Sequence, residues 1–165
     1  MTFDELSFDC QAAGEFTTLT SLEDPTFKIQ ERFTAIESDV GTCAQASVST
    51  GVVVVDTGKP KIQISTPRSE ATSVNTVNDC QVDFYIDGTA CVLGTDLSSS
   101  NIEVTLDEGS NRITIKHTDT LLALNVVVGN SDSFGCHIMV QTSLPGTFRS
   151  DETLLGLLGT PNGNK

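Results

Sequence analysis

The segment with the clearest possible chemistry is the last loop of the chain, Thr160-Pro161-Asn162-Gly163-Asn164. Calcium prefers about six to eight hard oxygen ligands. A tight loop with oxygen-bearing side chains on alternate positions, a glycine at its bend and inward-facing carbonyl groups supplies several of them. Asn-Gly is also a common two-residue hairpin turn. The residue types alone therefore leave two options open, a calcium-binding loop and a plain turn.

Groups suited to enzyme catalysis are few. The chain has two histidines, His117 and His137, and neither stands in an HExxH or similar metal-binding spacing. Both fall in expected strands, where we expect them to face solvent or to be hydrogen-bonded. Ser131-Asp132-Ser133 precedes His137, but no Gly-x-Ser-x-Gly elbow supports a hydrolase nucleophile. We therefore expect no enzyme activity.

The cysteines favour disulfide chemistry. There are five of them, at Cys10, Cys43, Cys80, Cys91 and Cys136, and their spacing includes no CxxC pair of the kind that binds zinc or forms a redox dithiol. In a secreted domain such cysteines form bridges, and we suggest the pairs Cys10–Cys43 and Cys80–Cys136. The odd cysteine is either a buried free thiol or a bridge to another chain.

The charge balance excludes two classes of partner. Asp and Glu number 22 against nine Lys and Arg, which gives a formal net charge of -13. Such a surface repels nucleic-acid phosphates and anionic lipid, because both are bound through Lys and Arg. No apolar run approaches the ~20 residues of a membrane span. We expect no nucleic-acid binding and no membrane insertion; the acidic residues either keep the chain soluble or attract divalent cations.

The sequence predicts that the elements which position these residues are β-strands. A chain of 165 residues suits one domain, and residues that favour strands outnumber strong helix formers. We expect an all-β fold, an antiparallel β-sandwich of roughly ten strands with little helix. The expected strands are 15–22, 27–36, 44–56, 61–65, 82–86, 89–93, 102–106, 112–117, 121–128 and 136–142.

Two hairpins are predicted from turn residues. Asp87-Gly88 supplies the positive-φ pair of a type I′ turn between strands 82–86 and 89–93. This register places Phe84 opposite Cys91, which is against a Cys80–Cys91 bridge. A second hairpin is expected around residues 107–111.

Two further segments are expected to lack strands. Thr66 to Asp79 reads as a surface connection, because it is rich in Ser, Thr and Asn. Leu154 to Leu158 reads as a short turn or helical step that packs the C-terminal segment against the sheet.

Both ends of the chain resemble the conserved edges of one family. Thr2-Phe3-Asp4 and Gly156-Leu157-Leu158-Gly159-Thr160-Pro161-Asn162-Gly163-Asn164 are similar to the opening and closing motifs of the von Willebrand factor type D domain. Residues 8–16, 27–33 and 46–52 resemble its first strands in non-animal members, so the resemblance covers nearly the whole chain. The closing motif departs from the family at Leu158, where a cysteine is usual.

The resemblance implies a calcium site. In the family, the closing motif packs beside the aspartate of the opening motif, and the two form the site together with acidic residues a little further on. Carried over by motif, the ligands are Asp4, Thr160, Asn162 and Asn164. Thr160 stands where the family usually has Asn, and the chain ends at Lys165 before the acidic pair.

The resemblance also implies a function. We expect residues 1–165 to be a single type D-like domain, excised from a larger protein whose signal peptide lies upstream. It would be an extracellular module, secreted or on the cell surface, that serves adhesion, matrix assembly or multimerisation with other extracellular proteins or copies of itself. The alternative is a β-sandwich that binds glycans or other ligands, although the chain offers only Tyr85 and no Trp as an aromatic platform.

Overall fold

The computed structural model describes residues 13–21, 27–35, 47–56, 58–67, 73–94, 101–118, 122–132, 135–143 and 154–155. Every regular element in this part of the chain is a β-strand, and all strand pairs are antiparallel. The strands are β1 (Gly14–Ser21), β2 (Lys28–Ala35), β3 (Ser47–Val55), β4 (Ile62–Ser65), β5 (Asn75–Val77), β6 (Cys80–Ile86), β7 (Thr89–Ala90), β8 (Ile102–Asp107), β9 (Arg112–His117), β10 (Ala123–Ser131), β11 (Gly135–Ser143) and β12 (Leu154–Leu155).

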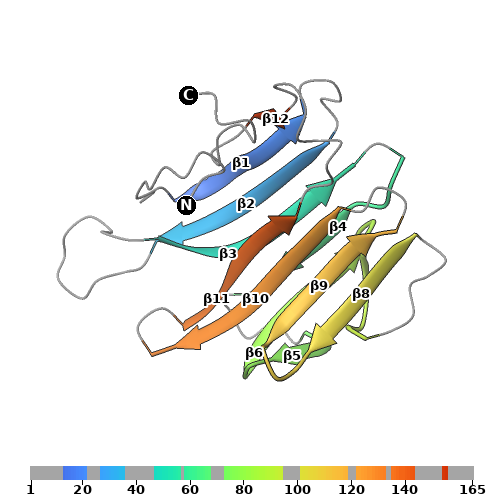
Figure 1. The fold of residues 1–165 in the computed structure, drawn as a ribbon. Helices are drawn as coiled ribbons and strands as arrows, with labels where there is room; N and C mark the ends of the chain where they lie inside the picture. The colour runs from blue at the N-terminus through green and yellow to red at the C-terminus, as the bar shows by residue number, and fades with distance from the viewer. Residues whose placement is uncertain are drawn as a thin grey trace.

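The strands form two sheets that pack face to face. The larger sheet has the order β12-β1-β2-β3-β4-β6-β5, with β7 paired to β6, and the smaller sheet has the order β11-β10-β9-β8. Figure 1 shows the smaller sheet lying across the part of the larger one that begins at β3, with β11 against β3 and β10 against β6. The expected all-β sandwich is confirmed.

Period-two alternation builds the core between the sheets. In β4, Ile62 and Ile64 are buried and Gln63 between them is half-buried. In β9, Ile113 and Ile115 are buried in the same way. Each fully buried aliphatic side chain contributes about 1.5–3 kcal/mol. Since the strands of both sheets place every second residue in this core, the residues between them form the outer faces of the sandwich.

A disulfide joins the two sheets. Cys80 on β6 is bonded to Cys136 on β11, with Cα atoms 5.6 Å apart, as the suggested pairing expects. The Thr66 hydroxyl donates to the Cys136 carbonyl at 3.4 Å, so the bridge lies where the sheets already touch. Cys91 is half-buried and forms no disulfide. The suggested pair Cys10–Cys43 lies outside the described residues.

Both predicted hairpins are confirmed. Asp87 and Gly88 have φ values of 50° and 77°, as a type I′ turn requires. The Cys91 amide donates to the Phe84 carbonyl at 2.9 Å, which is the predicted register. The second hairpin joins β8 to β9, and its turn contains Asn111 at φ 52°.

Two segment predictions are wrong. Residues 75–77, expected to belong to a surface connection, form β5 against β6, because the side chains of Asn75 and Val77 are buried. Leu154 and Leu155, expected in a turn or helical step, form β12 against Thr20 and Ser21 of β1. Both strands are short and their partners supply the pairing, so local residue types do not indicate them.

Candidate functional site

Five residues from five neighbouring strands form one row across the larger sheet. The cross-strand register aligns Glu15, Arg32, Gly51, Ser65 and Asp83. Alternate residues of a strand face the same side, so a second row runs beside the first. Its members are Thr17, Gln30, Val53, Gln63 and Tyr85. Both rows lie on the outer face, because the core residues of these strands alternate with them.

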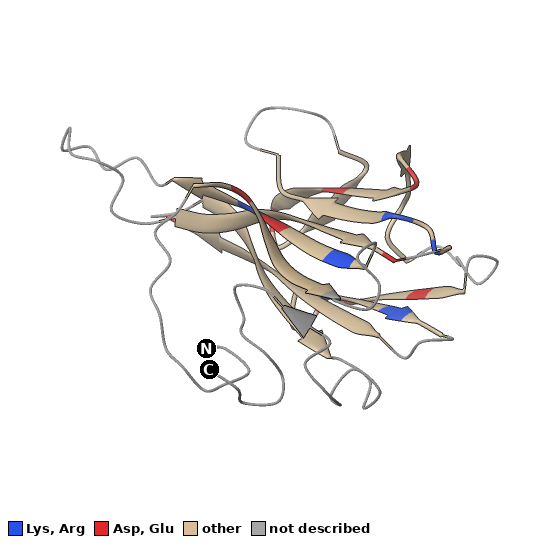
Figure 2. Ribbon diagram, turned by 90° about the horizontal axis from the view of Figure 1, so that it is seen from above, with Lys and Arg blue, Asp and Glu red and all other residues tan. Residues whose placement is uncertain are grey.

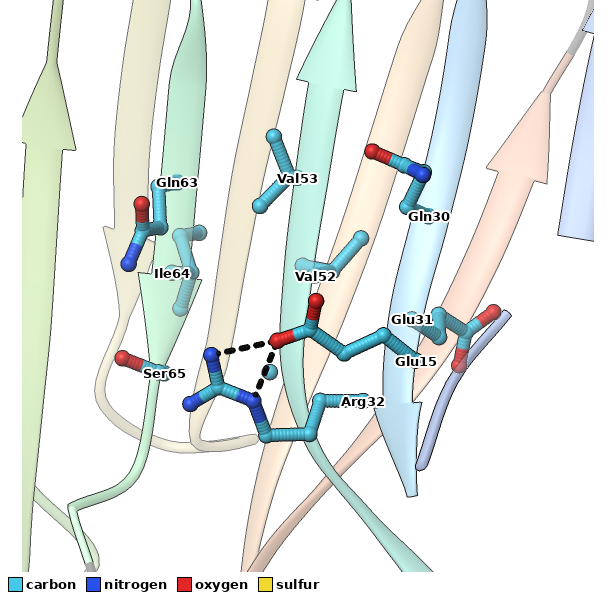
Figure 3. A pocket seen from close by; sticks show the side chains of 10 residues that line it. Glu15, Gln30, Glu31, Arg32, Val52, Val53, Gln63, Ile64 and Ser65 are labelled. Atoms are coloured by element: carbon cyan, nitrogen blue, oxygen red, sulfur yellow. Dashed lines mark hydrogen bonds and ion pairs between the residues drawn. The ribbon is translucent and has the colours of Figure 1, made fainter. Parts of the chain in front are cut away.

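The first row is hollowed in its middle. Gly51 has no side chain and Ser65 has a short one, and they lie between the longer side chains of Arg32 and Asp83. Figure 3 shows the Arg32 guanidinium extending from β2 toward Ser65. A Cβ atom at position 51 would lie 3.4 Å from the Ser65 Cβ and 3.7 Å from the Arg32 Cβ. A larger residue at this position would therefore fill the hollow.

The depression continues into a larger hollow toward β6. The part shown in Figure 3 has a volume of about 50 Å³, and the adjoining part has about 490 Å³. The second volume falls within the range of small-molecule sites, about 300–1,000 Å³. We call the two hollows together the outer groove; its main lining residues are Arg32, Thr50, Gln63, Ser65, Asp83 and Tyr85.

An ion pair orients Arg32, the one cation among the described residues of this lining. The Arg32 Nη2 and Nε atoms lie 2.7 Å and 3.0 Å from the Glu15 Oε1 atom. Both side chains are more than half exposed, so the pair contributes at most about 1 kcal/mol to stability. Its effect on the groove is that Arg32 is held in place with its charge compensated. Charged residues elsewhere on the described strands are scattered over both sheets (Figure 2).

Several polar side chains that face the groove make no hydrogen bond to other described residues. The hydroxyls of Thr34 and Thr50 are 2.7 Å apart and bond to each other. By contrast, no hydrogen bond joins the side chains of Gln63, Asp83 or Tyr85 to other described residues. Gln63 both donates and accepts, the Asp83 carboxylate accepts, and the Tyr85 hydroxyl does both. The groove therefore offers a ligand several unused hydrogen-bonding groups beside an aromatic ring.

Glu31 lies on the opposite side of β2 from the groove side chains. Its neighbours Gln30 and Arg32 face outward, so its carboxyl group is turned toward the interior, as Figure 3 shows. Burial raises its pKa, and the hydroxyl groups of Ser49 and Thr18 partly oppose this effect. Glu31 is therefore not a ligand-contacting group of the outer face.

His117 is a second titratable group in the interior, and the expectation of a solvent-facing or hydrogen-bonded side chain is wrong. The residue is 2% exposed, and neither ring nitrogen has a hydrogen-bond partner in the described part of the chain. Its Nδ1 atom lies 3.8 Å from the Asp56 Oδ2 atom. Burial lowers the pKa of His117; Asp56 acts to raise it and Lys59 to lower it.

This burial predicts a loss of stability in mild acid. The unfolded chain binds a proton at His117 at higher pH than the folded chain, so the free energy of unfolding falls as the pH drops below the ordinary histidine pKa of about 6.5. Glu31 has the opposite sign, because its raised pKa lets the folded state take up a proton first. Urea unfolding across pH should show a shallower decline for His117→Leu and a steeper one for Glu31→Gln. An equal decline in His117→Leu would contradict the assignment.

The residues predicted to bind calcium, Asp4, Thr160, Asn162 and Asn164, all lie outside the described residues. The described part contains no group of three His, Cys, Asp or Glu side chains that can hold a metal ion. It also contains no helix long and apolar enough to cross a membrane.

His137, the other histidine considered for catalysis, lies on the outer face of the smaller sheet. Its Nδ1 atom is 3.0 Å from the Gly135 carbonyl oxygen. Its ring packs against Gly129 on β10, where any side chain would collide with it. Glycine at position 129 therefore makes room for the ring, which is a packing role.

The sequence alone does not indicate the outer groove. Its residues are the polar members of alternating strands, and the same pattern is typical of any solvated sheet face. The signal that can reveal the groove is the pairing of small residues, Gly51 and Ser65, between long polar ones, and it becomes visible only once the strand register is known.

Comparison with known proteins finds no match, either to a protein-family model or to a curated protein. The resemblance of the chain ends to a type D domain therefore stays a prediction.

Proposed function

We propose that this chain is a non-enzymatic extracellular module that serves adhesion, matrix assembly or multimerisation. Its partners are other extracellular proteins or copies of itself. The observation that carries the proposal is the Cys80–Cys136 bridge. Disulfides persist in oxidising compartments and are rare in the cytosol, and this bridge ties the two layers of the fold together as a structural bond does.

The surface is consistent with such a role. Its strongly acidic composition, with a formal net charge of -13, favours calcium ions and basic protein surfaces over nucleic acid. The type D-like motifs at the two ends supply the expectation of one structural calcium ion. Extracellular modules need only weak sites, with Kd of about 10⁻⁴ to 10⁻³ M.

Calcium should stabilise the folded chain. We expect millimolar calcium to raise its Tm, because the ion binds the folded state and not the unfolded one. Asp4→Asn should abolish the rise, whereas Asp79→Asn, a change at an exposed turn residue, should leave it intact. Differential scanning calorimetry measures both. A Tm that does not change when calcium is added would count against the site.

Adhesion can be tested directly with coated beads. Beads carrying the folded chain should aggregate, or capture a second extracellular protein offered in solution, and the chain should show the same association in sedimentation velocity. Asp4→Asn should weaken this association if calcium maintains the binding conformation. Beads that stay dispersed and capture nothing, with a folded and calcium-loaded chain, would refute the adhesive role.

A further inference from the structure

We propose that the outer groove binds a neutral oligosaccharide, with a sugar ring stacked on Tyr85 and sugar hydroxyls bonded to Gln63 and Asp83. This inference goes beyond the adhesive role, because it assigns a ligand class and a site. It is also independent of the calcium site, since none of the groove residues belongs to the chain ends.

The shape of the groove suits a small ligand with several rings. Its larger part has a volume of about 490 Å³, and its floor crosses β3 and β4, where Gly51 and Ser65 leave space between Arg32 and Asp83. Gly88 also lines it beside Tyr85 and adds no side chain to close that end. The hollow therefore lies on a sheet face, where an extended peptide cannot add as a strand to an unpaired edge.

The aromatic ring lies at the wall of the groove. Tyr85 is the single tyrosine of the chain, it pairs with Gln63 across the strands, and both side chains are half-buried. A pyranose ring has an apolar C–H face and a polar rim of hydroxyl groups. An aromatic face next to an amide matches both parts, because the ring buries the C–H face while the amide donates to one hydroxyl and accepts from another.

The charges of the lining disfavour an anionic ligand. Among the described residues of the larger hollow, Arg32 and Asp83 are charged; Glu15 already compensates the Arg32 charge, so the Asp83 carboxylate is left uncompensated. Glu15 already occupies two donors of Arg32, so an anionic ligand would have to displace a carboxylate to bind there. The remaining guanidinium donors and the Asp83 carboxylate can still bond hydroxyl groups, which act as both acceptors and donors.

Partly buried polar side chains also lose less conformational entropy when a ligand binds than exposed, flexible side chains do. Gln63, Asp83 and Tyr85 are half-buried and emerge from paired strands, so their backbone positions are set before a ligand arrives. Such preorganisation reduces the entropy cost of binding. Because these side chains make no hydrogen bond to other described residues, a ligand need not break a protein contact to reach them.

The test is an NMR titration of the folded chain. The probes are disaccharides of glucose, galactose, mannose and N-acetylglucosamine, with sialylated and sulfated sugars and tetralysine as charged rivals. We expect at least one neutral sugar to give saturable shifts at the backbone amides of Gln63 and Tyr85, with β8 and β9 unaffected. Since no ionic contact is required, the affinity should hardly change when salt is raised.

Matched variants distinguish the loss of stacking on Tyr85 from a general loss of the folded structure. Tyr85→Ala should weaken sugar binding about fivefold or more, as truncation of an aromatic anchor does. Tyr85→Phe keeps the ring and should retain most of the affinity, and Thr105→Ala, on the outer face of the other sheet, should retain all of it. The proposal is overturned if no neutral sugar gives saturable shifts, if the shifts lie away from the groove, or if only a charged sugar or tetralysine occupies it.

Discussion

Replacing both Cys80 and Cys136 with alanine should lower the free energy of unfolding by about 4 kcal/mol. The two cysteines are 56 residues apart. In the chain-entropy model, a bond that closes a loop of that length lowers the conformational entropy of the unfolded chain and so destabilises the unfolded state by about this free energy. The effect should be large because the bond joins β6 of one sheet to β11 of the other. Removing it leaves the two layers held by packing and by hydrogen bonds such as the one from the Thr66 hydroxyl to the Cys136 carbonyl.

Urea unfolding of the double variant measures this loss. Cys91→Ala is the matched control, since Cys91 is half-buried and forms no disulfide, and it should cost much less. Adding a reducing agent to the unmodified chain should reproduce the loss seen in the double variant. If the double variant unfolds at the same urea concentration as the unmodified chain, the bridge is not a structural bond of this fold.

Replacing Asn75 with alanine should lower the free energy of unfolding by about 2 kcal/mol. This is the second largest effect that we expect. The Asn75 side chain is buried; its Nδ2 group donates to the carbonyls of Val82 at 3.3 Å and Cys91 at 2.9 Å. Its Oδ1 atom accepts from the Leu93 amide at 2.7 Å. Alanine would leave these backbone groups without the partner that now satisfies them.

The destabilisation caused by Asn75→Ala should be confined to the residues around Asn75. Hydrogen exchange of the Leu93 amide should speed up in the variant, because that amide donates to Asn75. Thr76→Ala is the control, since Thr76 is exposed on the same strand, and it should leave both stability and exchange nearly unchanged. Equal effects from both substitutions would mean that β5, and not the Asn75 side chain, holds the 91–93 segment.

Much of the fold can be predicted from the sequence because its signals are local. In Val82-Asp83-Phe84-Tyr85-Ile86 every second residue is apolar, which identifies a strand with one buried face. Asp87-Gly88 then identifies the turn that follows it. Both signals act within a few residues, so they hold whatever the rest of the chain does.

The parts that escaped prediction depend on distant partners. Residues 75–77 contain only one apolar side chain, and what makes them a strand is their pairing with β6 and the three hydrogen bonds of Asn75. His117 lies in a predicted strand, but its burial depends on residues far away in the sequence, such as Asp56, whose Oδ2 atom lies 3.8 Å from the His117 Nδ1 atom. Tertiary contacts of this kind leave no periodic signal.

The outer groove also depends on contacts between distant residues, so the sequence alone does not predict it. Glu15 and Asp83 lie at opposite ends of one row only because four antiparallel pairings align five strands. A shift of one residue in the pairing of β4 or of β6 would turn Gln63 or Tyr85 toward the core. The residue types could be read from the sequence, but their meeting on one face required the register.

A disulfide map of the protein from its native source tests both the extracellular assignment and the Cys80–Cys136 bridge. The thiols are trapped with an alkylating reagent at the moment of isolation, and the peptides are identified by mass spectrometry without reduction. An extracellular module with its two sheets bonded together predicts that Cys80 and Cys136 are recovered in a single linked pair of peptides. Recovery of both residues as alkylated free thiols would contradict the extracellular assignment and the bridge together.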